Sequence, residues 1–151
     1  MPYFHDKDLL VYVEREIIPG LVEDCIAEFY VRFGVSLDVS PPSLVVIDTI
    51  IRDAGLAPER DSLSGPIGAY LGAVLCSSDG ARWNPAFNRE RGVDGYQTSR
   101  VSLYNQDVDV FDLAAGALVG FPSLHDTFTT LHRPIVRINR TAGKETVPLK
   151  S

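Results

Sequence analysis

The sequence of 151 residues has few of the side chains on which common metal and redox motifs depend. Its two cysteines, Cys25 and Cys76, form no CxxC motif and are too few for a disulfide framework. We expect two unpaired thiols packed as small hydrophobic side chains, with a bond between them as the alternative. There is no HExxH motif, and His125 and His132 would lie about 10 Å apart along one helix, too far to share a metal ion. We therefore expect no metal site.

Long apolar runs are also missing. The longest ones, such as residues 9–13, have four or five residues, whereas about 18 are needed to cross a bilayer. The first residues do not combine a basic region with an apolar one, which predicts no signal peptide. The simplest expectation is a soluble cytoplasmic protein that has no membrane partner.

The chain has no excess of positive charge, since 14 Lys and Arg face 20 Asp and Glu, a net charge of −6. Nucleic acids and anionic lipids need a basic surface, so we expect neither as a partner. Residues 1–62 hold 12 acidic and 5 basic side chains, and residues 63–151 hold 8 and 9. A basic protein is the expected partner of the acidic N-terminal half, unless that half is an ordinary solvated surface. The candidate partner-binding residues are Glu14, Glu16, Glu23, Asp24 and Glu28.

Signatures of nucleotide-binding and hydrolytic enzymes are absent. The chain has no GxGxxG, GxxxxGK[ST] or GxSxG segment. Asp107, Asp109 and Asp112 form an acidic cluster, but it lacks the glycine and the later glutamate of a calcium loop, so helix capping is expected there. We accordingly expect no catalytic residues, no enzyme activity and no cofactor.

The spacing of apolar residues predicts an α+β fold, with N-terminal helices, a small antiparallel sheet and two C-terminal helices. One domain is expected over residues 1–140, including a last strand at 135–138, and a tail over residues 141–151. Pro19 and Gly20 are expected to break or kink the first helix. Gly68 and Gly72 share a helix face and predict close approach of another element. The predicted helices cover residues 6–17, 21–33, 41–55, 66–77, 111–119 and 122–132, and the strands cover 81–84 and 98–104.

A basic and aromatic segment falls on the predicted sheet. Arg82, Trp83 and Arg100 are candidates for binding a small carboxylate or phosphate. In the alternative reading, the tryptophan anchors the sheet against the helices and the arginines flank a solvated loop. Packing of the last helix on the hairpin would add His125 and Asp126 and create an enzyme site.

Several segments between residues 37 and 131 resemble those of a group of small uncharacterised bacterial proteins. Residues 37–44, LDVSPPSL, are similar to LDxSPxSL; residues 68–75, GAYLGAVL, to GAYLGEVI; and residues 80–83, GARW, to GGRW. Residues 108–111, VDVF, are similar to a VDPF helix start. The resemblance implies a bacterial origin and a shared fold pattern, and it assigns no activity. Ala73 replaces a glutamate that is frequent in the group.

Small size, acidity and the missing catalytic signatures favour a protein-binding module. An inhibitor or immunity protein that neutralises a basic toxin or enzyme would fit these features. The alternatives are an enzyme or small-anion-binding protein with a site near Arg82, Trp83 and Arg100, and a small-molecule sensor or accessory subunit.

Overall fold

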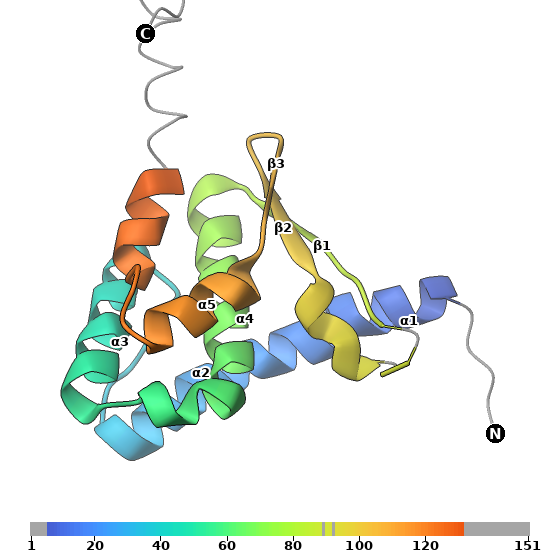
Figure 1. Cartoon of the computed structure of the whole chain (residues 1–151). Helices are drawn as coiled ribbons and strands as arrows, with labels where there is room; N and C mark the ends of the chain where they lie inside the picture. Colours follow the sequence, from blue (N-terminus) through green and yellow to red (C-terminus); the bar gives the residue numbers. More distant parts are fainter. Residues whose placement is uncertain (1–5, 89, 92, 132–151) are drawn as a thin grey trace, which may run out of the picture.

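Helices lie before and after a three-stranded antiparallel sheet, so the fold is α+β as predicted (Figure 1). The computed structural model describes residues 6–88, 90–91 and 93–131, without the side chains of residues 93 and 94. The expected strand at 135–138, the tail at 141–151 and His132 lie outside the described residues. The buried apolar side chains of the described part form one core.

The N-terminal helical stretch runs on past Pro19 without a break, but with a local departure from α-helical geometry. It consists of α1 (Asp6–Tyr12), a π-helical turn η1 (Val13–Ile17) and α2 (Ile18–Phe33). Pro19 has no N–H to donate, and its ring would clash with the carbonyl group four residues earlier in a regular α-helix. The wider π-helical turn lies just before this proline and relieves that conflict. Gly34 ends α2 as predicted, with φ +70° and its N–H directed at the carbonyls of Phe29 and Tyr30.

Two further helices follow, with the short 3₁₀ helix η2 (Ala57–Glu59) between them. Helix α3 (Pro41–Ala54) begins at the predicted proline, although the Ser40 side chain makes no capping hydrogen bond. Helix α4 (Arg60–Asp79) begins six residues before the predicted start and contains Pro66. The predicted start of this helix at residue 66 is therefore wrong. Residues of α4 are buried on all sides, which makes it the central helix of the core.

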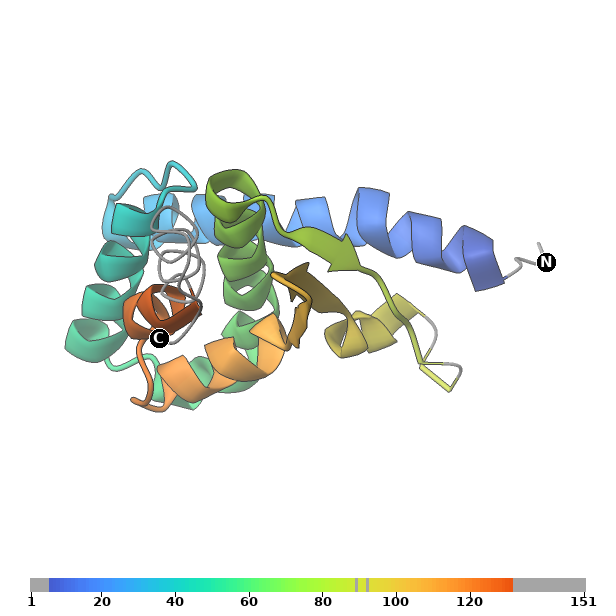
Figure 2. The same cartoon turned by 90° about the horizontal axis from the view of Figure 1, so that it is seen from above.

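The sheet is a meander of β1 (Arg82–Asn84), β2 (Arg100–Leu103) and β3 (Gln106–Val108), in that order. The first two strands were predicted; β3 and the 3₁₀ helix η3 (Val93–Thr98) in the long connection were not. Asp109 caps α5 (Val110–Leu118) by accepting a hydrogen bond from the Asp112 N–H at 3.0 Å, as expected from the sequence. Residues 124–131 form the last described helix. It lies beside α3, while the sheet lies across α4 from it (Figures 1 and 2).

Three glycines on one side of α4 make room for aromatic rings. A Cβ atom added to Gly68 would lie 2.6 Å from Cδ1 and 2.9 Å from Cα of Phe111. Cβ atoms added to Gly65 and Gly72 would collide with the Tyr96 hydroxyl group and the Trp83 ring. The rings also pack on one another, with centroids 6.0 Å apart for Trp83–Phe111 and 5.3 Å for Tyr96–Phe111. The close approach predicted for Gly68 and Gly72 is confirmed, and we call this contact the aromatic seam.

A chain of hydrogen bonds joins α4 to the start of α3. The Ser43 hydroxyl donates to the Ser40 carbonyl at 2.6 Å, so the buried Tyr70 hydroxyl donates to Ser43 Oγ at 2.5 Å. Tyr70 in turn accepts from the Val39 N–H at 2.8 Å. Val39 has φ +58°, a strained value for a β-branched residue, and this bond helps to hold it there.

Candidate functional site

The predicted acidic residues lie along one helical rod but on different sides of it. Glu14 and Glu16 belong to η1, and Glu23, Asp24 and Glu28 belong to α2. All are exposed except Glu28, which is partly buried. The structure therefore divides these five residues between separate surfaces.

An open groove follows α2 where the C-terminal half of α4 crosses it. We call it the α2–α4 trough. Its volume is about 540 Å³, and its lining residues are Glu14, Ile18, Pro19, Val22, Glu23, Ala73, Cys76, Ser77 and Trp83. The trough thus brings together two of the predicted acidic residues and the predicted ligand-binding tryptophan.

Chemically, the α2–α4 trough combines an apolar lining with unpaired negative charge. Val22 of α2 and Trp83 of β1 supply apolar surface, and the α4 side consists of the short side chains of Ala73, Cys76 and Ser77. Among the described residues, no hydrogen bond or ion pair engages Glu14 or Glu23. Since the two are nine positions apart on one helical rod, they are about 13 Å apart along it. Such a surface favours a ligand that has both apolar and cationic groups.

A second groove, of about 440 Å³, lies between α2 and the N-terminal half of α4 and includes Asp24, Glu28 and Glu59. One guanidinium engages two of its three carboxylates. The Arg32 guanidinium donates to Glu28 at 2.9 Å and to Glu59 at 2.7 Å, and this contact holds the pKa of Glu59 below its usual range. A cationic ligand would compete here with Arg32, and this makes the groove the weaker candidate.

The thiols occupy different environments. Both are unpaired, as expected. Cys25 is a buried residue of α2, and burial raises its thiol pKa to about 12. Cys76 is only partly buried and lines the α2–α4 trough. Burial raises the pKa of Cys76 as well.

The structure separates the predicted arginine and tryptophan site on the sheet. In the β1–β2 register, Arg82 pairs with Ser102, Trp83 with Val101, and Asn84 with Arg100. Because side chains alternate across a strand, Arg82 and Arg100 project from the face opposite to Trp83. Arg100 also donates to the Thr98 carbonyl at 2.7 Å and lies 3.4 Å from an Asp109 oxygen. Trp83 instead anchors the sheet on α4 at Gly72.

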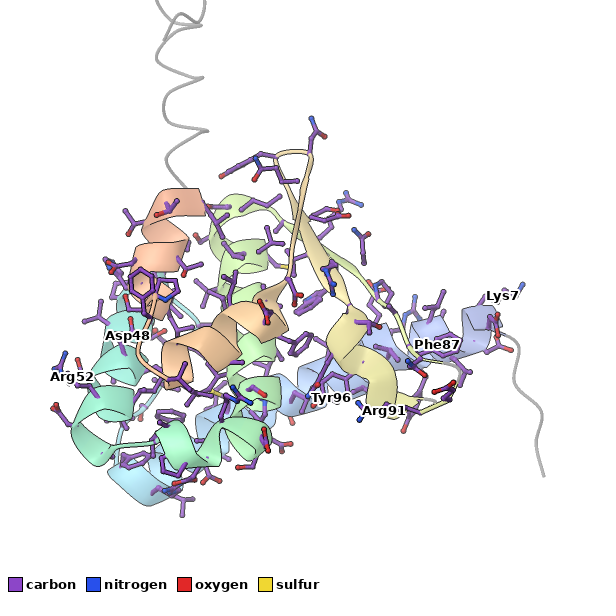
Figure 3. The ribbon with its side chains drawn as sticks, in the orientation of Figure 1. Lys7, Asp48, Arg52, Phe87, Arg91 and Tyr96 are labelled. Carbon is purple, nitrogen blue, oxygen red and sulfur yellow. The ribbon has the colours of Figure 1, made fainter. Side chains whose placement is uncertain are left out.

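His125 and Asp126 lie on the last described helix, beside α3 and away from the hairpin, so they do not join the arginines (Figure 1). Their helix is held by Asp48 of α3, whose carboxylate accepts from the N–H groups of Leu124 at 2.8 Å and His125 at 2.9 Å. Figure 3 shows Asp48 on the side of α3 that faces this helix. Burial raises the pKa of Asp48, although these two hydrogen bonds oppose the shift.

Sequence reasoning missed the α4 side of the α2–α4 trough. Ala73, Cys76 and Ser77 carry no charge and no motif, and only folding brings them beside Glu14 and Glu23.

Searches for metal sites, membrane-spanning helices and similar proteins assign no function to the chain. Within the described residues, no group of three or more His, Cys, Asp and Glu side chains is arranged to hold a metal ion. No helix in the same part of the chain has the length and apolar character to cross a membrane. Neither a scan against protein-family models nor searches of curated proteins and solved structures found a match.

Proposed function

We propose that this protein is a cytoplasmic protein-binding module whose partner is a basic protein, and that the partner binds in the α2–α4 trough. The observation that carries the proposal is the position of Glu14 and Glu23. Both are exposed, both lie without a cationic partner among the described residues, and both border apolar surface. An amphipathic segment with Lys or Arg beside apolar side chains would satisfy both parts of this surface.

An inhibitor or immunity protein that neutralises a basic toxin or enzyme is the form of this function that we favour. Negative charge on the binding surface speeds the encounter with a basic protein. Apolar contacts at the centre of an interface then slow dissociation, because most differences in affinity arise from the dissociation rate. The α2–α4 trough offers both features on one face of α2.

The experiment begins with the full chain as bait in an extract of its native host, followed by purification of the captured protein. Affinity is then measured for wild type and for two variants with the same change in charge. Glu14→Lys/Glu23→Lys alters the α2–α4 trough, and Glu16→Lys/Asp24→Lys alters exposed positions outside it. The first variant is expected to bind at least about tenfold more weakly, whereas the control changes affinity about threefold or less.

Two results would overturn the proposal. Equal affinity of the wild type and Glu14→Lys/Glu23→Lys would show that the trough does not contact the partner. An equal loss in both variants would show that only the overall charge of the chain matters. Raising the salt concentration is expected to weaken binding of the wild type more than binding of Glu14→Lys/Glu23→Lys.

A further inference from the structure

The charge of the chain changes sign near residue 132. Of the 14 basic residues five lie in residues 132–151, against one of the 20 acidic residues, so that segment has a net charge of +4 and residues 1–131 have −10. The neutral balance of residues 63–151 thus conceals a basic C-terminal segment attached to a strongly acidic body. The chain therefore carries a cationic segment of its own.

The sequence of residues 132–140 has the composition that the α2–α4 trough would select. It reads HRPIVRINR, with three arginines and three aliphatic side chains in nine residues. Arg137 and Arg140 flank Ile138, so two cationic groups lie on either side of an apolar one. The α2–α4 trough offers the complement, two unpaired glutamates along an apolar lining.

We propose that residues 132–140 of the same chain bind in the α2–α4 trough, with Arg137 and Arg140 beside Glu14 and Glu23 and the aliphatic side chains over Val22 and Trp83. The inference does not need an external partner. It goes beyond the proposed function, because a basic partner would have to displace this segment before it binds.

The place where the segment begins and its length both bear on this contact. The helix of residues 124–131 ends on the side of the molecule where α4 also ends, and the last turns of α4 supply Cys76 and Ser77 to the trough (Figures 1 and 2). The six residues from Leu131 to Arg137 span at most about 20 Å. Covalent attachment also gives the segment a local concentration on the order of millimolar, so weak contacts suffice for occupancy.

The competing groove between α2 and the N-terminal half of α4 is less suitable. Its Glu28 and Glu59 already bind Arg32, so an incoming arginine would gain little there. Glu14 and Glu23 have no such internal competitor among the described residues. Among the described residues, the competing groove thus offers one carboxylate without a partner, Asp24, and the α2–α4 trough offers two.

Cys76 provides the test, because a bound segment shields it from a small reagent. Alkylation by uncharged iodoacetamide is followed by mass spectrometry in the folded full chain, and the buried Cys25 is an internal control for unfolding. Arg137→Glu/Arg140→Glu is expected to raise the Cys76 rate about fivefold, the factor for a segment bound roughly 80% of the time. The charge-matched control, Lys144→Glu/Lys150→Glu, is expected to react like the wild type.

A charge swap separates specific contact from altered thiol chemistry. Glu14→Lys/Glu23→Lys is measured with the wild-type segment and with Arg137→Glu/Arg140→Glu. Both proteins carry the same lysines beside Cys76, so a difference in rate reports the segment. Cys76 is expected to react more slowly in the protein that carries all four substitutions than in Glu14→Lys/Glu23→Lys with the wild-type segment.

Three outcomes would overturn the inference. One is an equal Cys76 rate in the wild type and Arg137→Glu/Arg140→Glu. Another is an equal acceleration in the control variant, which would indicate only general electrostatics. The third is a wild-type rate that falls as protein concentration rises, because it would identify a second copy as the occupant.

Discussion

The two sides of α4 show how small residues lead either to close packing or to open space. On the side of α5 and the sheet, Gly65, Gly68 and Gly72 each receive an aromatic ring, and the seam is filled. On the side of α2, Ala73, Cys76 and Ser77 are also small, but no large side chain of the described residues covers them. The aromatic seam stabilises the fold, and the α2–α4 trough is open in the described part of the chain.

The largest expected effect is the cost of one methyl group in the aromatic seam. Gly68→Ala is expected to lower the free energy of unfolding by about 3 kcal/mol, because the new Cβ would meet the backbone of Phe111 as well as its ring. Urea denaturation followed by circular dichroism measures this loss.

Gly20→Ala is the matched control for that substitution. Gly20 lies in α2, and an added Cβ would have no atom within 4 Å. Since alanine favours a helix over glycine, this variant is expected to be more stable by about 0.5–1 kcal/mol. A similar loss in both variants would contradict the account of the seam.

Tyr70→Phe tests a polar contact of α4 on its α3 side. The substitution removes the hydroxyl group that accepts from the Val39 N–H and donates to Ser43. We expect a loss of about 1–3 kcal/mol in the free energy of unfolding, because buried polar groups are left without a partner. Ser62→Ala, at an exposed site on α4, is the comparison and is expected to change stability by less than about 0.5 kcal/mol.

Asp48→Asn is expected to lower the free energy of unfolding by about 1–2 kcal/mol at neutral pH. An amide offers one acceptor, where the carboxylate offers two to Leu124 and His125.

The cost of Asp48→Asn depends on pH. A folded-state pKa raised above the ordinary 3.8 means that the folded protein binds the proton more tightly. The wild type therefore gains stability relative to Asp48→Asn as pH falls from neutral toward 3.8, and loses it as pH rises through the raised pKa. Urea denaturation of both proteins across this range measures the difference, and a constant difference would contradict the shift.

The smallest effect on stability is expected in the α2–α4 trough. Ala73→Phe adds a ring at a partly buried position in open space, so the free energy of unfolding is expected to change by less than about 1 kcal/mol. A loss as large as that of Gly68→Ala would show that the two sides of α4 do not differ as described. Thermal and urea denaturation both serve as the readout.

Local signals in the sequence predicted much of the fold. Gly34 and Gly55 end helices with positive φ, and Asp109 begins one, because each acts through its neighbours in the chain. The two prolines had different outcomes. Just before Pro19 the helix departs from regular α-helical geometry in a π-helical turn, whereas α4 begins six residues before Pro66 and contains it.

The candidate site was only partly predictable. Charge identified Glu14 and Glu23, and residue type identified Trp83, but nothing in the sequence indicated that they line one surface. That surface depends on the crossing of α2 over α4, which joins residues about 50 positions or more apart. For the predicted ligand-binding residues of the sheet, strand alternation places Arg82 and Arg100 on the face opposite to Trp83.

The most direct test of the central claim, that the open α2–α4 trough is the binding surface, is the affinity of Ala73→Phe for the purified basic partner. This variant changes no charge and is expected to keep its stability. We predict binding at least about tenfold weaker than that of the wild type, because the ring occupies space that the partner needs. Wild-type affinity in a stably folded Ala73→Phe protein would contradict the claim.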